Sequence, residues 1–298
     1  MIKGIPNPFT LMDIANRLVY LKFTREYLSR FLKTGSINQE NAFLVKLILD
    51  SFLNHLPHPD YFISPATITR LTKNSNIPGI GLNRLTKVEH ISHPKTEFVK
   101  TYGRCNIPGS PVFYGSFNFI TIMKEMRVKK GDIVTHSRWR LKSNATSLKV
   151  FPIFFLTESS RNVHNSLSLD IKRMHQNYIN DLQESEKEYM NISMELIARI
   201  FAKDVDIDNH YDYLLSAYLS NNILSNPEAQ YDAIMYPSVQ DGLETTNLAI
   251  TPMAMSKFEP EEVTHDIFLG IRNGGGMFNG IYHTHRFDVD NGLILWDD

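Results

Sequence analysis

Four residues have the types and the spacing that could carry out chemistry: Arg104, Tyr114, Glu125 and Ser238. The arginine precedes a proline-glycine turn, the tyrosine follows ten residues later, the glutamate eleven residues after that, and the serine comes far downstream. A guanidinium offers a planar fork of donors suited to phosphate groups. A carboxylate stabilises developing positive charge or acts as a general base. A phenol stacks on a ring, and a hydroxyl positions a ligand by hydrogen bonding.

Each of these side chains also has a purely structural interpretation. An arginine beside a turn commonly binds backbone carbonyls or a carboxylate, a tyrosine on a strand commonly packs in the core, and a glutamate on a helix is commonly solvated. The hypothesis of a shared site therefore depends on the four residues occurring together, and not on any one of them.

Short elements around these residues are expected to position them. The run Pro111–Gly115 predicts a buried strand, Ser116 is expected to cap a helix that continues to about Met126, and 132–139 predicts the next strand. Ser238 would end a core strand that starts at Ala233, and 248–251 predicts a second core strand beyond a polar turn. Glu125 would then lie near the end of its helix.

The remaining segments are expected to be mostly helical. From Phe9 to Leu56 apolar residues recur at helical spacing, with a break at 34–36 and with Ser36 or Asn38 able to cap the second helix. We therefore divide the chain into a helical N-terminal module, residues 1–75, and a second domain, residues 76–298. The second domain would carry a helical enlargement at about 160–222 and a C-terminal hairpin, in which 267–271 and 281–285 flank the turn 273–276.

Composition excludes several classes of protein. The chain has 298 residues, 42% of them apolar, and a formal charge of -1, so it can bury a core and has no strong attraction for nucleic acid. The most apolar stretch, 150–156, is far shorter than the roughly 20 residues of a membrane helix. The first residues lack the pattern of an export signal, and Cys105 is the single cysteine, so we expect a cytoplasmic protein that binds neither nucleic acid nor membrane.

The segment Tyr102-Gly-Arg-Cys-Asn-Ile-Pro-Gly-Ser-Pro-Val-Phe-Tyr114, followed by Glu125 and by Met235-Tyr-Pro-Ser238, resembles the RES domain, a family named for its Arg, Glu and Ser. The similarity extends over roughly residues 82–255 and includes the strand that contains Asn247. Arg84 resembles a further arginine near the first strand of the family domain.

This resemblance implies an α+β fold with mixed sheets, similar to that of the ADP-ribosyltransferases, and NAD as substrate. RES proteins act largely as bacterial toxins that deplete NAD and are commonly neutralised by a cognate antitoxin. For this chain the resemblance implies cleavage of the nicotinamide–ribose bond, by hydrolysis or phosphorolysis. It leaves two alternatives open, a protein ADP-ribosyltransferase and an inactive NAD-binding sensor or interaction module.

Roles for the residues follow from that substrate. Glu125 would stabilise the oxocarbenium-like transition state or activate the acceptor. Arg104 would bind the pyrophosphate, Tyr114 would stack on the nicotinamide, and Ser238 would contact the ribose or place the acceptor. Arg84 and Asn247 complete the expected NAD-binding residues, and the reaction requires no metal. The N-terminal helices would cover a sheet, bind a regulatory partner or form a homo-oligomer.

His283 and His285 are two residues apart on a predicted strand, so both rings would project from one face, as paired metal ligands sometimes do. The sequence offers no third ligand that can be assigned to them. We therefore interpret the pair as part of an exposed strand face and predict no metal site.

Overall fold

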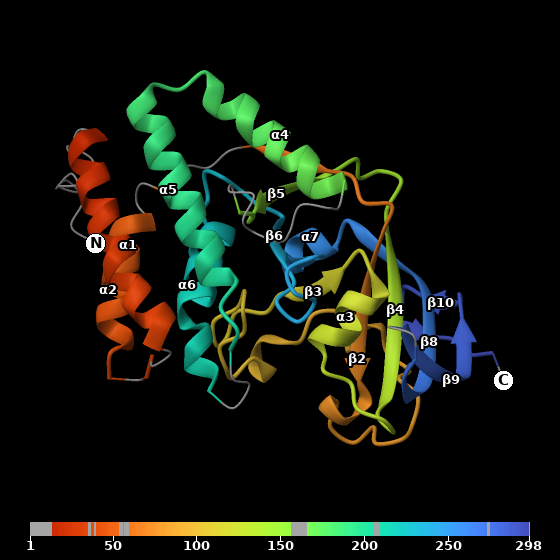
Figure 1. Ribbon diagram of the computed structural model, residues 1–298. Coiled ribbons are helices and arrows are strands. Elements are labelled where there is room, and N and C mark those ends of the chain that lie inside the picture. The colour runs from red at the N-terminus through yellow and green to blue at the C-terminus, as the bar shows by residue number, and fades with distance from the viewer. Residues whose placement is uncertain are drawn as a thin grey trace.

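The computed structural model has an α+β fold in which the described residues form seven α-helices and one large mixed sheet (Figure 1). It describes residues 14–34, 37–38, 40–53, 56, 60–155, 166–205, 209–272 and 275–297. None of the helices within these ranges is long and apolar enough to cross a membrane. Ser36, the turn residues 273–274 and the start of the expected helical enlargement lie outside the described residues.

Nine strands form the large sheet, in the order β1-β5-β6-β7-β3-β2-β4-β8-β9. Their bounds are β1 Tyr61–Ile63, β2 Thr67–Lys73, β3 Phe113–Ser116, β4 Ile133–Leu141, β5 Leu148–Pro152, β6 Ala233–Pro237, β7 Thr246–Ile250, β8 Phe258–Arg272 and β9 Gly275–Thr284. All neighbours pair antiparallel except β5 and β6, which are parallel. A small second sheet pairs β10 (Phe287–Asp288) with β11 (Leu293–Ile294).

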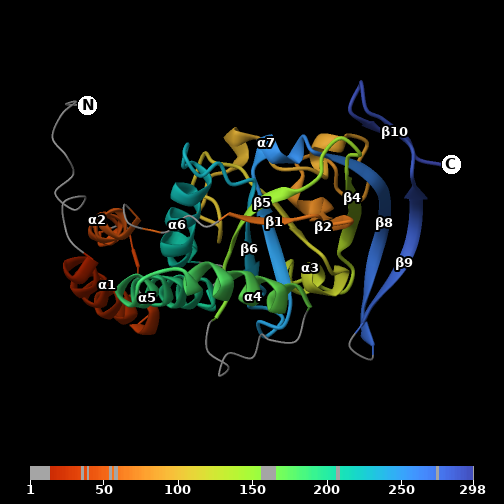
Figure 2. The ribbon, with the colours of Figure 1, turned by 90° about the horizontal axis from the view of Figure 1, so that it is seen from above.

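The helices are α1 Ile14–Thr34, α2 Ala42–Leu53, α3 Phe119–Glu125, α4 Ser166–Asn180, α5 Glu184–Phe201, α6 Leu214–Leu224 and α7 Pro252–Met255. α1 packs on α5 and α2 packs on α6. Figure 2 shows these four helices gathered at one end of the molecule and the β8–β9 hairpin at the other. The N-terminal helices therefore cover other helices of the same chain, with Leu18, Leu21 and Leu28 of α1 buried.

Several predicted elements are confirmed. The strands at 111–115 and 132–139, the helix that ends near Met126, the helices of the enlargement and the C-terminal hairpin are all present. Asn38 accepts hydrogen bonds from the backbone N–H groups of Glu40 and Asn41, at the start of α2. β1 and β2 were not predicted, because residues up to 75 were assigned to a helical module.

The cap of α3 differs from the prediction. Ser116 is still part of β3, where it pairs with Asn247, so its backbone is extended three residues before the helix begins. Asn118 is the residue that caps α3, since its side-chain oxygen accepts a hydrogen bond from the Ile120 backbone N–H at 2.8 Å. The Ser116 hydroxyl instead donates to the Thr246 carbonyl at 2.9 Å, which connects β3 to the start of β7.

α3 packs on one face of the sheet and carries Glu125 at its C-terminal end. Ile122 lies in a small apolar cluster with Leu71 of β2 and Val134 of β4, while Phe119 contacts His136 and Phe278 of the same sheet. Because side chains alternate along a strand, Leu71, Val134 and His136 mark one face of the sheet. The position of Glu125 is thus set by burial of the apolar side of α3.

Candidate active site

Glu125 and Ser238 are joined directly, together with Asn247. The Ser238 hydroxyl donates to Oε1 of Glu125 at 2.6 Å, and Nδ2 of Asn247 donates to the same oxygen at 2.9 Å. Ser238 is 0% exposed and Asn247 is 1% exposed, whereas Glu125 is half-buried. Two buried donors therefore fix a carboxylate that solvent or a ligand can still reach.

The three residues meet because of the pairing of the strands. Asn247 on β7 lies opposite Tyr236 on β6 and opposite Ser116 on β3. Ser238 directly follows β6 and is two residues beyond Tyr236, so the side chains of Tyr236, Ser238 and Asn247 belong to the same face of the sheet. This is the face on which α3 packs, and its last residue is Glu125.

The segment that follows Ser238 is bound to α3. Asp241 forms an ion pair with Lys124, and the Thr121 hydroxyl donates to the Thr245 hydroxyl at 2.8 Å. The Asp241 backbone N–H also donates to the Ser238 hydroxyl oxygen at 3.2 Å. Leu243 in this segment has φ +68°, a left-handed conformation that costs energy for a residue with a branched side chain. Contacts with α3 hold the segment and so keep Ser238 beside Glu125.

The Arg104 side chain is buried, with 7% exposure, and it binds backbone carbonyls. Nη1 donates to the Phe201 carbonyl at 2.5 Å and to the Lys203 carbonyl at 3.1 Å, and the guanidinium lies 5.2 Å from the centre of the Tyr213 ring. Carbonyls at the end of a helix lack partners within the helix and carry partial negative charge. Arg104 thus provides a hydrogen-bond donor for the carbonyl groups at the C-terminal end of α5. This is the structural role, binding of backbone carbonyls, that the sequence allowed as an alternative to a role in the site.

Tyr114 uses its hydroxyl to hold the turn that contains Arg104. The hydroxyl donates to Oδ1 of Asn106 at 2.9 Å and accepts the backbone N–H of Cys105 at 2.8 Å. Burial raises the pKa of the Tyr114 phenol well above its usual value, so the group stays protonated and can donate. Burial also raises the pKa of the Cys105 thiol, to about 12, so this cysteine is not a reactive thiolate at neutral pH.

Tyr236 is a buried residue that lies among the predicted site residues. Burial is the main cause that raises the pKa of its phenol well above the usual value. The charges of Cys105, Tyr114 and Glu125 raise the pKa of this phenol further, and the Arg104 guanidinium opposes them. Tyr114 belongs to the same face of the sheet as Tyr236 and Asn247, because it lies two residues before Ser116, the partner of Asn247 on β3. Tyr236 was not among the predicted site residues, although its position two residues before Ser238 puts both side chains on one face of the strand.

Arg84 is not part of this group. Its guanidinium lies 4.2 Å from the centre of the Tyr282 ring on β9, and Tyr282 pairs with His265 on β8. His265 neighbours Thr264, which pairs with His136 on the α3 side, so His265 and Tyr282 belong to the opposite face. The structure does not bring Arg84 together with Glu125.

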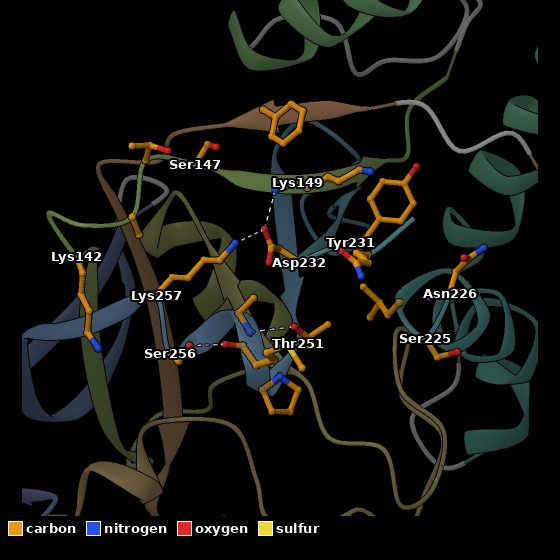
Figure 3. A pocket seen from close by; sticks show the side chains of 18 of the residues that line it. Lys142, Ser147, Lys149, Ser225, Asn226, Tyr231, Asp232, Thr251, Ser256 and Lys257 are labelled. Atoms are coloured by element: carbon orange, nitrogen blue, oxygen red, sulfur yellow. Dashed lines mark hydrogen bonds and ion pairs between the residues drawn. The ribbon is translucent and has the colours of Figure 1, made fainter. Parts of the chain in front are cut away.

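A cavity of about 1300 Å³ lies at the other end of β6 (Figure 3). Asp232 is central to it and accepts hydrogen bonds from Nζ of Lys257 at 2.6 Å and from the Lys149 backbone N–H at 2.8 Å. Because β6 begins next to Asp232 and ends next to Ser238, this cavity is separate from the Glu125 group. Its central carboxylate is already paired with a cation, so it is a weaker candidate for catalysis.

A carboxylate fixed by two buried donors beside the interior strands β6 and β7 of a mixed sheet defines a class of site that can stabilise positive charge or activate an attacking group. The RES domain family model matches residues 83–268, which is more than half of the chain and includes Glu125, Ser238 and Asn247. The chain belongs to the RES domain family. A search of curated proteins finds no match. Membership of this family is consistent with an NAD-related, toxin-like function.

Proposed function

We propose that this protein cleaves NAD at the bond between nicotinamide and ribose and passes the ADP-ribose to water or phosphate. The observation that carries this proposal is the Glu125 carboxylate, half-buried and held through Oε1 by Ser238 and Asn247, inside the region that matches the RES family. Among the described residues, both hydrogen bonds to this carboxylate end on Oε1, so Oε2 is the oxygen that remains for a substrate.

The reaction breaks the C–N glycosidic bond, and nicotinamide leaves with the bonding electron pair as a neutral molecule. Positive charge develops on the ribose in an oxocarbenium-like transition state, which a nearby carboxylate stabilises. The oxygen of water or phosphate then forms the new bond to the sugar carbon. In our proposal Glu125 receives the proton of the attacking water, or orients the phosphate, and later releases the proton to solvent.

Ser238 and Asn247 serve as positioning residues for the carboxylate. Oδ1 of Asn247 is buried and has no hydrogen-bond partner among the described residues. A buried acceptor of this kind calls for a donor. A ribose hydroxyl would be a suitable one, and because Asn247 is 1% exposed, this contact requires neighbouring side chains to move when the substrate binds.

Arg104 and Tyr114 remain proposed NAD contacts. Nη1 of Arg104 is already bound to two carbonyl oxygens, so a contact with the pyrophosphate must use the other guanidinium nitrogens or break these bonds. The Tyr114 hydroxyl is likewise bound to the turn that holds Cys105 and Asn106, so the ring face is the part of Tyr114 that remains for nicotinamide.

The experiment is to incubate the purified full chain with NAD, with and without inorganic phosphate, and to measure nicotinamide and the ADP-ribose products by chromatography. We expect nicotinamide release by the wild type and a loss of about 10²–10⁴-fold in Glu125→Gln, the range for removal of a general base. The matched control is Glu244→Gln, because Glu244 is an exposed glutamate of the segment that follows Ser238.

Three outcomes would contradict the proposal. Label from NAD on a protein, with little free ADP-ribose or ADP-ribose phosphate, would identify a protein ADP-ribosyltransferase. Saturable NAD binding with no product would identify a sensor. Equal turnover by Glu125→Gln and the wild type would remove the carboxylate from the chemistry.

A further inference from the structure

A second cluster of chemically competent side chains lies on the β8–β9 hairpin. Nε2 of His283 lies 2.8 Å from Oε1 of Glu262, and the rings of His283 and His285 are 4.5 Å apart and nearly perpendicular. One potential ligand atom from each of Glu262, His283 and His285 lies within 4.8 Å of the other two. Glu262 is the third group that the sequence could not assign to the histidine pair.

Strand register explains why these residues meet. Thr284 pairs with Val263, so the next pair along the hairpin brings His285 opposite Glu262. His283 lies diagonally across from Glu262 and on the same face as His285, since it is two residues away. The three side chains therefore project together from one face at the outer strand of the sheet.

Neighbouring groups orient the potential ligands in the way that metal sites require. Nη2 of Arg138 lies 2.8 Å from Oε2 of Glu262, which leaves Oε1 directed at His283. Nδ1 of His285 lies 3.0 Å from the Glu261 carbonyl oxygen. A histidine that donates from one ring nitrogen to a carbonyl keeps the lone pair of the other nitrogen for a metal, and ligating carboxylates are commonly hydrogen-bonded in turn.

The ligand types and separations suit zinc. Two imidazoles and one carboxylate are ordinary zinc ligands, and bonds of about 2.0–2.1 Å put the ligand atoms of a tetrahedral site about 3.4 Å apart. The present separations, from 2.8 Å to at most 4.8 Å, bracket this value, so side-chain rotations are sufficient to reach it. His283 and His285 are exposed, which leaves a route for the ion and a fourth position for water.

We propose that Glu262, His283 and His285 bind one zinc ion, with water as the fourth ligand, and that this ion links β8 to β9 at the edge of the sheet. Zinc binding displaces the contact between His283 and Glu262 and replaces it with two metal–ligand bonds. The site is separate from Glu125, which lies at the end of α3 and beside β6 and β7.

The test uses the tag-free full chain, freed of metals by a chelator and titrated with zinc sulfate in a calorimeter. We expect one ion per chain with a Kd of about 10 μM or tighter. His283→Ala, His285→Ala and Glu262→Gln should each weaken binding by at least about tenfold, because loss of even an outer partner of a metal site costs about 10–100-fold. Cobalt(II) should give the visible absorption bands of a tetrahedral site in the wild type and lose them in His285→Ala.

The matched control is His93→Ala, a histidine outside the hairpin whose ring contacts the Pro94 carbonyl. It should bind zinc as the wild type does. All variants are compared for their unfolding temperature in chelator, so that a misfolded variant is recognised, and zinc should raise this temperature in the wild type and in His93→Ala. A Kd weaker than about 10 μM, or the same Kd in His285→Ala as in the wild type, would overturn the proposal.

Discussion

Replacing Ser238 by alanine should weaken both the fold and the candidate site, by amounts that follow from two hydrogen bonds. The hydroxyl donates to the Glu125 carboxylate at 2.6 Å and accepts the Asp241 N–H at 3.2 Å, in a position with 0% exposure. A charge-assisted bond contributes about 1.5–3 kcal/mol and a neutral one about 0.5–1.5 kcal/mol, so Ser238→Ala should lower the free energy of unfolding by about 2–4.5 kcal/mol. Release of the carboxylate should also lower NAD turnover about 10²-fold, the effect of a misplacement of about 1 Å.

Urea unfolding and nicotinamide release measure the two effects on the same preparations. Ser256→Ala is the control, because the Ser256 hydroxyl also makes a 2.6 Å hydrogen bond, to the Met253 carbonyl, but is exposed. It should change the free energy of unfolding by no more than about 0.5 kcal/mol. The reasoning is refuted if the two alanine variants lose equal stability, or if Ser238→Ala keeps wild-type turnover while the wild type is active.

Two further predictions concern His136 and Tyr114. Burial lowers the pKa of His136 to about 4 from an ordinary value of 6.5, so between these pH values the unfolded chain binds the extra proton and acidification destabilises the fold. The free energy of unfolding should fall by about 3 kcal/mol as the pH falls to about 4. In His136→Gln, urea unfolding at different pH values should show a smaller fall over this range. The same fall in the variant and the wild type would contradict the prediction. Tyr114→Phe removes the hydroxyl that binds the buried Cys105 N–H and the Asn106 side chain. The free energy of unfolding measured in urea should therefore fall by about 2–3 kcal/mol. A variant as stable as the wild type would contradict this prediction.

Local patterns were sufficient for the elements that surround the candidate site. Apolar runs and turn residues predicted β3, α3, β4 and the C-terminal hairpin, because each of these has one dominant periodicity. β2 was missed because residues up to 75 were assigned to a helical module, although Thr67–Lys73 is rich in the β-branched residues that favour strands. Its pairing with β3 on one edge and β4 on the other was not predictable from the local pattern.

The contacts within the site were predictable only in part. The resemblance to the RES domain implied that Glu125, Ser238 and Asn247 belong together, and the structure joins them by hydrogen bonds. The partner of Arg104 was not predictable, because the carbonyls that it binds belong to the end of a helix 97 residues further along the chain. The third group beside His283 and His285 likewise depends on strand register, which the sequence does not determine where bulges interrupt the pairing of β8.

The parallel pairing of β5 with β6 has a consequence for how this chain can be shortened. Two neighbouring parallel strands cannot be joined by a tight turn, and they need a connection of about a dozen residues or more that crosses from one end of the sheet to the other. Here that return path includes α4, α5 and α6. A shortened chain must therefore keep a connection between β5 and β6 that is long enough to cross the sheet. Residues inserted into this connection, in contrast, leave the ends of both strands in place.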